Sequence, residues 1–158
     1  MSLRNFKLVK KKLTGWANYP QCDSSVAYPT TLEELKTLVS EKNIIARGNA
    51  RSYGDSSISK SITVDMKKFS KIIDLNEDTG EITAEAGVLL SDLIIQYLPR
   101  GFFPYVTPGT KYVTLGGMIA SDIHGKNHHV EGSISNYVSW IDVIQADGGT
   151  RTAAITGC

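Results

Sequence analysis

Hydrophobic and polar positions in this chain follow strand or helix spacing in short, separate segments. Ile62, Val64 and Met66 alternate with Thr63 and Asp65. Successive side chains of a strand point to opposite faces, so this alternation predicts a strand with one buried face.

Two segments have the spacing of amphipathic helices. The first follows Pro29, where Thr31 and Glu34 are placed as in a capping box. Leucines then recur on one face of the predicted helix. The second candidate spans Leu89 to Leu98 and is expected to end at Pro99.

Other segments have the composition of strands. The apolar run Ile44–Ala46 leads directly into a glycine loop. Ile72–Leu75 and Glu81–Ala86 flank five turn-forming residues, which predicts a hairpin. Val138–Ala146 and Thr150–Ala154 flank Asp-Gly-Gly, which predicts another. The pattern as a whole predicts an α+β chain.

Composition narrows the classes of function. Apolar residues make up 41% and charged residues 21% of the 158 residues, values typical of a globular domain. The formal net charge of +1 gives no basic field, so nucleic acid is not expected as a partner. No apolar run approaches the roughly 18 residues of a membrane span. Cys22 and Cys158 are expected to be reduced thiols of a cytoplasmic protein.

The N-terminal segment is basic but lacks the apolar core of a signal peptide. Its lysines are typical of a solvated face, and a peripheral contact with an anionic membrane is the alternative. The lysines concerned are Lys7, Lys10, Lys11 and Lys12.

The chain stops at AAITGC, directly after a hairpin pattern, which suggests a cut through a longer protein.

The first candidate site is the loop Arg47–Asp55, RGNARSYGD, which follows a predicted strand. Successive backbone N–H groups in such a turn can form a concave anion site. Gly48 and Gly54 allow close approach, and Arg47 and Arg51 supply positive charge. For a single loop of this kind, a plain surface turn is the alternative.

A second glycine-rich stretch, Val106–Gly132, favours an anion site over a plain surface turn for the first loop. Few of its residues favour regular structure, since each glycine costs roughly 0.5–1 kcal/mol inside a helix or strand. One loop can hold a pyrophosphate while the other lies along a flavin ring and its ribityl chain. The two stretches together indicate a large, flat dinucleotide cofactor.

Other cofactor signatures are absent from the sequence. No Gly-x-Gly occurs, so the dinucleotide fingerprint of the doubly wound fold fails. The pair Gly125-Lys126 has Ala120 where a P-loop requires glycine. The histidines of this stretch have no cysteine and no firm carboxylate partner at a ligand spacing, so no metal is expected.

RGNARSYGD followed by PGTKYVTLGGMIASDIHGKNHH resembles the FAD-linked oxidases of the vanillyl-alcohol-oxidase and p-cresol-methylhydroxylase (PCMH) superfamily. The run DIHGKNHH is most similar to its sugar-oxidising branch, which contains decaprenylphosphoryl-ribose, aldonolactone and alditol oxidases. The resemblance covers Tyr28–Thr152. It implies a PCMH-type FAD-binding fold of two α/β subdomains with the cofactor between them, truncated at the C-terminus.

The resemblance also implies an arrangement of domains. Residues 1–27 would be an N-terminal extension and residues 28–76 the first FAD subdomain, which carries the pyrophosphate loop. Residues 77–158 would be an incomplete second FAD subdomain, and the substrate domain would lie outside this chain.

The implied site follows the two glycine stretches. The first would wrap the FAD pyrophosphate, and the second would contact the flavin and its ribityl-phosphate chain. His124 and Lys126 would form part of the substrate-cavity wall, and no residue is proposed as the catalytic base. The expected cofactor residues are Arg47, Gly48, Asn49, Ala50, Arg51, Ser52, Tyr53, Gly54, Gly109, Thr110, Thr114, Gly116, Gly117, Ser121, His124, Gly125 and Asn127.

One departure from the family pattern bears on cofactor attachment. Many relatives tether FAD through a histidine of the first loop, at the place where Arg51 stands here. Arginine cannot form that bond, so the resemblance implies non-covalent FAD.

The expected function is flavin-dependent oxidation of a CH–OH group in a sugar, a sugar lactone or a lipid-linked sugar. The electron acceptor, oxygen or a quinone, is left open. The alternatives are an FAD domain of 2-hydroxy-acid oxidase or UDP-sugar reductase type and a non-catalytic anion- or nucleotide-binding module.

Overall fold

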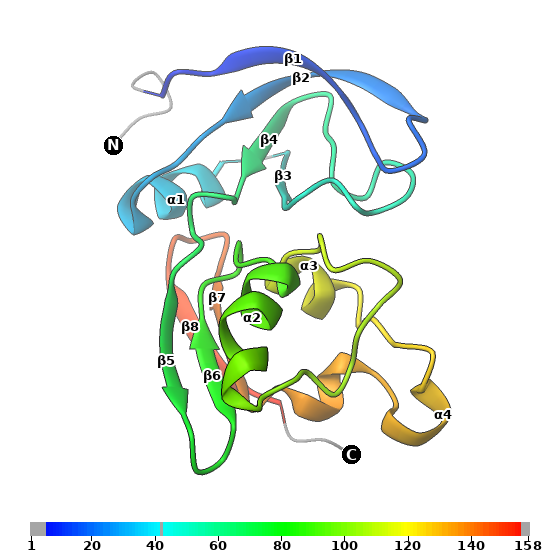
Figure 1. Ribbon diagram of the computed structural model, residues 1–158. Helices are drawn as coiled ribbons and strands as arrows, with labels where there is room; N and C mark the ends of the chain where they lie inside the picture. The colour runs from blue at the N-terminus through cyan, green and yellow to red at the C-terminus, as the bar shows by residue number, and fades with distance from the viewer. Residues whose placement is uncertain (1–5, 42, 156–158) are drawn as a thin grey trace. The chain divides into compact units, whose positions relative to one another are not determined.

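The computed structural model describes residues 6–41 and 43–155, and the chain forms two compact units (Figure 1). The first contains the residues up to Lys68 together with Ile141–Ala153. The second contains Phe69–Trp140 and the residues from Ala154 onward. These boundaries differ from those expected after residues 27 and 76, since the first unit takes in both the N-terminal strands and a late hairpin.

A four-stranded sheet forms the first unit. Its strands lie in the order β1-β2-β4-β3, with β1 antiparallel to β2 and with β4 parallel to both β2 and β3. The bounds are β1 Val9–Thr14, β2 Gln21–Ala27, β3 Ile44–Arg47 and β4 Ile62–Asp65.

The expectation of one buried face for β4 is wrong. All four of its residues are buried, the polar Thr63 and Asp65 included. The strand lies inside the sheet, where parallel strands are covered on both faces. Thr63 satisfies its hydroxyl there by a 2.8 Å hydrogen bond with the buried hydroxyl of Ser24.

The strands β1 and β2 lie in the segment expected to be an extension. Three consecutive lysines occupy β1, so the strand shows no apolar alternation. It is an edge strand, and exposed lysines are a common way to protect such an edge from pairing with other chains. Half of this sheet therefore lies before the predicted first subdomain.

The helix α1, Leu32–Val39, confirms the predicted capping box. The Thr31 hydroxyl accepts a hydrogen bond from the Glu34 backbone N–H at 3.2 Å. The Glu34 carboxylate accepts in return from the Thr31 N–H at 3.2 Å. Both bonds satisfy donors that a helix start would otherwise leave without partners.

The second unit begins with the predicted hairpin and helix. The strands β5 Ile72–Asn76 and β6 Glu81–Ala84 pair antiparallel, and α2 Leu90–Tyr97 continues into the 3-10 turn η2 Leu98–Arg100. Pro99 lies within that turn, and Gly101 ends it at a φ of 88°. The core consists of Val88, Leu93 and Tyr97, with Ile72, Leu75, Ile82, Ala84, Phe102 and Leu115 packed against it.

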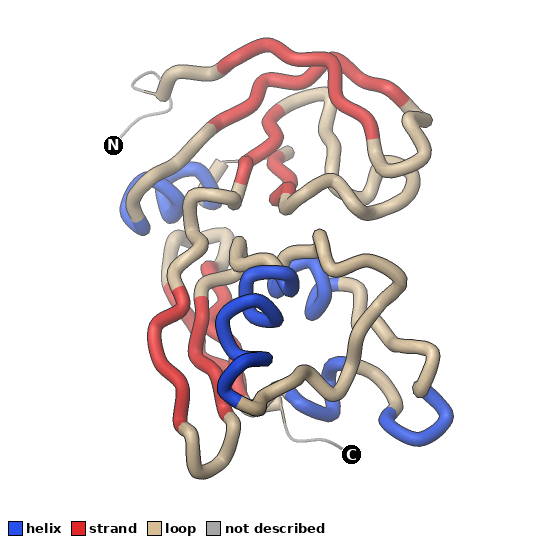
Figure 2. The backbone as a smooth tube through the Cα atoms, viewed as in Figure 1, coloured by secondary structure: helices blue, strands red, loops and turns tan. Residues whose placement is uncertain are grey.

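The expectation that the second glycine stretch lacks regular structure is wrong in part. It contains two short helices, α3 Leu115–Ala120 and α4 His128–Glu131 (Figure 2). Gly116 and Gly117 lie inside α3, where the contact of Gly116 with Ala86 offsets its low helix propensity.

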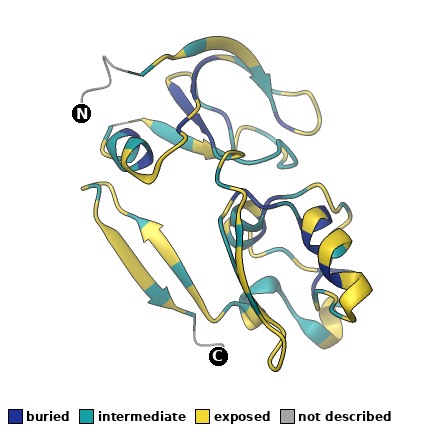
Figure 3. Cartoon of the chain, turned by 60° about the vertical axis from the view of Figure 1, so that its left-hand side comes forward, coloured by how far each residue is buried: buried dark blue, intermediate teal, exposed yellow. Residues whose placement is uncertain are grey.

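The hairpin near the end of the chain is also confirmed. The 3-10 turn η3, Ile134–Tyr137, precedes β7 Trp140–Ile144, and β8 Thr150–Ala154 follows. Most residues of both strands are exposed (Figure 3). Trp140 and Tyr137 are 44% and 39% exposed, so neither ring is part of the buried core.

Two sequence expectations concern the thiols and the membrane. Cys22 is a free, half-buried thiol, and Cys158 lies outside the described residues. Among residues 6–41 and 43–155, no helix is both long and apolar enough to cross a membrane.

Candidate functional site

The predicted anion loop begins where the parallel strand β3 ends. Arg47 is the last residue of β3, and the chain then runs through an irregular loop before β4. Ala50 and Gly54 have positive φ angles of 57° and 62°. Left-handed residues of this kind curl the backbone, as in the concave N–H arrangements that bind anions.

The Arg47 side chain holds this loop in place. Its Nη2 donates to the carbonyl oxygen of Thr14 at 2.8 Å, and its Nη1 donates to the Ser57 carbonyl and hydroxyl, both at 3.3 Å. Burial lowers the pKa of the Arg47 guanidinium, and the nearby Asp65 carboxylate opposes that change. The bonds that these two nitrogens make tie β1 to the segment after the loop.

Arg51 lies at the middle of the loop, against an aromatic ring. Its guanidinium carbon is 4.6 Å from the centre of the Trp16 ring, within the range of a cation–π interaction. Ser52, the next residue, donates from its hydroxyl to the Ser57 hydroxyl at 2.9 Å. Tyr53 is 71% exposed, so its ring is accessible beside these groups.

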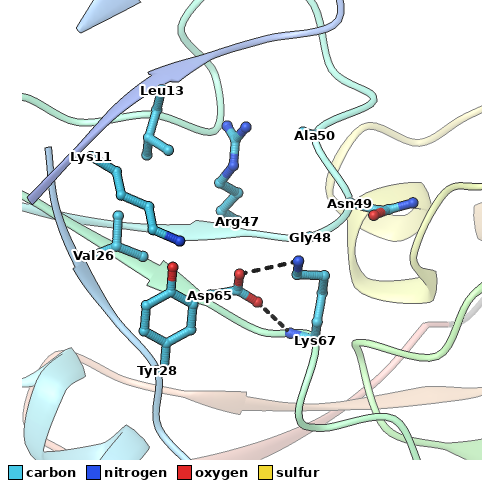
Figure 4. Close-up of a pocket in the computed structure, with 10 residues that line it drawn as sticks. All are labelled: Lys11, Leu13, Val26, Tyr28, Arg47, Gly48, Asn49, Ala50, Asp65 and Lys67. Atoms are coloured by element: carbon cyan, nitrogen blue, oxygen red, sulfur yellow. Dashed lines mark hydrogen bonds and ion pairs between the residues drawn. The ribbon is translucent and has the colours of Figure 1, made fainter. Parts of the chain in front are cut away.

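A cavity of about 280 Å³ lies beside the start of the loop. Lys67 forms an ion pair with Asp65 at 3.4 Å, and Lys11 lies over the Tyr28 ring at 5.1 Å. Figure 4 shows Lys67 directed back toward Asp65, whereas Asn49 points away from that pair. The cavity is lined by Lys11, Leu13, Val26, Tyr28, Arg47, Gly48, Asn49, Ala50, Asp65 and Lys67.

The charges of this cavity favour an anion. Three of its lining side chains are cationic, whereas Asp65 is its one carboxylate. None of the lining residues outside the loop was predicted from the sequence. Asp65 ends the strand β4 and Lys67 follows it. Only their place at the carboxyl end of that strand, next to a glycine loop, could have indicated them.

In the second unit, Thr114 begins the helix α3. Its buried hydroxyl accepts from the Gly117 N–H at 3.3 Å. The Gly116 N–H donates to the Ala86 carbonyl at 2.8 Å. A Cβ atom on Gly116 would lie 2.9 Å from the Ala86 Cβ, so glycine is required there by contact within the protein.

Other glycine-stretch positions face open space. Gly109 is exposed, and a Cβ atom there would meet no described atom within 4 Å. Gly117 and Ser121 are exposed as well. The Thr110 hydroxyl accepts from the Tyr112 N–H at 3.2 Å. These positions leave accessible backbone against which a flat group can lie.

His124 and His128 share one acceptor. The Nδ1 atoms of both rings lie 3.3 Å and 3.2 Å from the Gly125 carbonyl oxygen. The ring centres are 5.1 Å apart in an edge arrangement. Asn127 donates from Nδ2 to the Tyr105 carbonyl at 3.1 Å, which fastens this segment to the start of the glycine stretch. Lys126 is exposed.

Asp122 lies just before these side chains and fixes the start of their segment by hydrogen bonds. It has a φ of 40°, and its carboxylate accepts from the Ser133 hydroxyl at 2.9 Å and from the Ser135 N–H at 3.1 Å. The hydrogen bond from Ser133 lowers the pKa of the Asp122 carboxyl. An isolated bridge between His124 and Ser133 joins the same two stretches of chain.

The predicted residues fall into two groups, one in each compact unit. Those of the first loop belong to the first unit, and those from Gly109 onward belong to the second. In the part of the chain that the structure describes, no three His, Cys, Asp or Glu side chains form a metal-binding group.

Comparison with known proteins gives these groups a context. A protein-family model described as an FAD binding domain matches residues 24–154. Decaprenylphosphoryl-beta-D-ribose oxidase of Mycolicibacterium smegmatis is 36% identical over 158 residues, covering 96% of this chain and 34% of that protein. L-gulonolactone oxidase of Mus musculus is 26% identical, covering 85% of this chain and 32% of that protein.

Two further matches are a relative that aligns with only part of this chain and a solved structure of low sequence identity. D-2-hydroxyglutarate dehydrogenase of Escherichia coli is 33% identical over 106 residues, covering 65% of this chain and 10% of that protein. The crystal structure of cholesterol oxidase from B. sterolicum aligns at a TM-score of 0.79 and 18% identity, covering 96% of this chain and 33% of that one. The last match shows the fold alone.

The chain thus spans about a third of the length of the two sugar-oxidase relatives. The matched family region contains both the anion loop and the second glycine stretch. The α+β fold and the recognition of a flavoenzyme domain are confirmed. This chain belongs to the FAD binding domain family.

Proposed function

We propose that the full-length protein is an FAD-dependent oxidoreductase that oxidises a CH–OH group of a sugar, a sugar lactone or a polyprenyl-phosphate sugar. The observation that carries this proposal is the 36% identity to decaprenylphosphoryl-beta-D-ribose oxidase along nearly the whole chain. The likeness to L-gulonolactone oxidase supports a sugar-like substrate independently of the lipid.

The first unit would hold the pyrophosphate of FAD. Its curled loop, with Ala50 and Gly54 at positive φ, has the backbone form that suits an anion. Arg51 in the loop and the cationic cavity beside Gly48 place positive charge at this loop. Arg47 would contribute mainly by holding the loop, because three acceptors within the protein already receive its Nη donors.

The second unit would contact the flavin half. Exposed backbone at Gly109 and Gly117 gives a flat ring room to approach. Thr110, the residue after Gly109, carries a hydroxyl. His124 and Lys126 would form part of the substrate-cavity wall. When bound, FAD supplies the two-electron acceptor that oxidation of an alcohol requires. No residue of this chain is assigned as the base that takes the hydroxyl proton.

Attachment of the cofactor would be non-covalent. Arg51 stands where the resemblance places a tethering histidine, and a guanidinium cannot form that bond. Mass spectrometry of the denatured full-length protein tests this directly. The expected result is a polypeptide of unmodified mass with free FAD in the supernatant, and an added flavin mass would contradict it.

A second candidate function is oxidation of a D-2-hydroxy acid. It is favoured by the 33% identity to D-2-hydroxyglutarate dehydrogenase over 106 residues. Fold and cofactor would be the same, but the alcohol would carry an adjacent carboxylate. The sugar proposal is preferred because its relative matches 96% of this chain rather than 65%.

The electron acceptor and the membrane contact are secondary proposals. Oxygen and a quinone are the acceptors to be compared. The lysines of β1 suit a peripheral contact with an anionic membrane, which would bring a lipid-linked sugar to a cytoplasmic enzyme.

The experiment adds candidate substrates to the full-length protein without oxygen and measures the loss of its flavin absorption bands. The substrates are a polyprenyl-phosphate ribose, L-gulono-lactone and D-2-hydroxyglutarate. Bleaching by either sugar compound supports the proposal, and bleaching by the hydroxy acid alone favours the second candidate. A protein that stays colourless after refolding with FAD overturns both.

A further inference from the structure

The end of β1 and the turn that follows it contact the anion loop at four points. The Trp16 N–H donates to the Ser52 carbonyl at 2.9 Å. Arg47 reaches the Thr14 carbonyl at 2.8 Å, and Arg51 lies over the Trp16 ring at 4.6 Å. The fourth contact is the close approach of Gly15 to the loop backbone.

Gly15 shows how tightly the two segments fit. A Cβ atom on this buried residue would lie 2.7 Å from the Ser52 carbonyl oxygen and 2.7 Å from the Gly54 carbonyl oxygen. Contacts with backbone oxygens at that distance cannot be relieved by moving a side chain. The turn and the loop are therefore packed backbone against backbone.

The turn lies outside the part of the chain that matches the family model, although the loop that it contacts lies inside. The family model matches from residue 24 onward, whereas the turn precedes that point. Gly15 and Trp16 do not belong to the residues that the resemblance assigns to the cofactor. The matched fold alone thus assigns no role to the turn.

We propose that residues 14–16, here called the hairpin clamp, orient the anion loop for the cofactor, with Trp16 as the positioning residue for Arg51. The Trp16 ring fixes the Arg51 guanidinium by a cation–π contact, and the Trp16 backbone N–H fixes the Ser52 carbonyl. Orientation before binding reduces the ordering cost of binding, so the clamp raises affinity without touching the ligand. The inference rests on the proposed binding of FAD at this loop.

The first test measures FAD affinity of full-length Trp16 variants stripped of flavin. Trp16→Ala is expected to weaken binding roughly tenfold, the equivalent of losing one cation–π contact. Trp16→Phe restores most of the affinity because the ring remains, whereas Trp16→Leu keeps the bulk but not the ring and stays weak. Tyr19→Ala is the matched control, since Tyr19 is an aromatic residue of the same turn and 79% exposed.

The second test needs no cofactor. In flavin-free protein, tryptic cleavage after Arg51 reports how firmly the loop is held. Trp16→Ala and Gly15→Ala are both expected to speed this cleavage relative to other sites, and Tyr19→Ala is expected to leave it unchanged. The Gly15 variant provides a second route if Trp16→Ala fails to fold.

The outcomes separate the clamp from the proposed function. A wild-type protein that binds no FAD overturns the proposed function, and faster cleavage of the variants then still supports the clamp. Wild-type affinity in both Trp16→Ala and Trp16→Leu, with unchanged cleavage after Arg51, overturns the clamp. Equal weakening by Tyr19→Ala also overturns it, because the effect would then be general to the hairpin.

Discussion

Gly116 and Ala86 are in direct contact within the second unit. The Gly116 N–H donates to the Ala86 carbonyl at 2.8 Å, and a Cβ atom on Gly116 would lie 2.9 Å from the Ala86 Cβ. The next residue, Gly117, is exposed, and its added Cβ would meet a single described neighbour within 4 Å, the Thr114 hydroxyl at 3.0 Å. The adjacent glycines therefore serve different purposes, one in packing and one in leaving the surface open.

Gly116→Ala is expected to destabilise the protein before any cofactor is considered. The added methyl would press on the Ala86 side chain and carbonyl, and overpacking of this kind costs about 1–3 kcal/mol. Thermal unfolding of the flavin-free protein measures the loss. An unchanged midpoint would show that the contact with Ala86 relaxes freely.

Gly117→Val is expected to act on the cofactor instead. A branched side chain on this exposed position would occupy the surface where the flavin half is proposed to lie. The molar ratio of bound FAD to protein should fall well below one, even after incubation with excess FAD. Gly116→Ala is the comparison variant, since saturating FAD should still load whatever fraction is folded. Stoichiometric FAD in Gly117→Val would contradict the placement of the second glycine stretch.

Asp122→Asn is expected to loosen the segment that presents His124 and Lys126. Asparagine tolerates the φ of 40° at this position, so the backbone is not strained by the change. Its neutral amide lacks the negative charge that strengthens the hydrogen bonds from Ser133 and Ser135, so the bond that the Ser135 N–H donates is expected to weaken. Hydrogen exchange should show reduced protection of the Ser135 N–H. Unchanged protection would mean that other contacts hold the segment.

The same carboxylate gives a pH dependence with a definite sign. The pKa of Asp122 is lowered in the folded protein, so its contribution to stability is complete above the ordinary value of 3.8. That contribution is lost as the pH falls through the lowered pKa. In the wild type, the protection factor of the Ser135 N–H should fall over this acid range, and in Asp122→Asn it should not.

The capping box of α1 gives a prediction in the first unit. Thr31→Ala removes the hydroxyl that accepts the Glu34 N–H, and such a loss costs about 0.5–2 kcal/mol. Chemical denaturation of the protein measures it. Ser40→Ala, at the other end of the helix, is the comparison, and an equal effect there would argue against a specific cap.

Glu34 adds a pH test of that cap. Hydrogen bonds from the Thr30 backbone and hydroxyl lower its pKa below the ordinary 4.5. Its stabilisation is therefore present above that value and is lost on acidification through the lowered pKa. Glu34→Gln should flatten the acid limb of the stability profile, and a profile identical to wild type would contradict the assignment.

Several elements could be predicted because their causes are local. The capping residues of α1 lie three positions apart, and the β5–β6 hairpin follows from its strand pattern and turn residues. The anion loop was recognised for the same reason, since its glycines and arginines are neighbours in sequence. The match over residues 24–154 supports the recognition of the two glycine stretches as a flavoenzyme signature.

The errors arose where the surroundings override local preference. The lysines of β1 show no apolar alternation, because an edge strand can carry charged side chains that protect its free edge. The β4 alternation failed because an inner parallel strand is buried on both faces. In α3, glycines that weaken an isolated helix are retained because Gly116 must pack against Ala86.

The amino-acid sequence by itself determined which short segments become helices, hairpins and glycine loops, and it determined the chemistry that those loops carry. Only the tertiary structure decided which distant groups support them. Arg47 bonds to Thr14 across 33 positions, and Arg51 rests on Trp16. Such pairs form because β1 pairs with β2 in the sheet, and the turn between these strands then lies against the anion loop. Spacing along the chain does not encode that proximity, because it arises only when the strands pair.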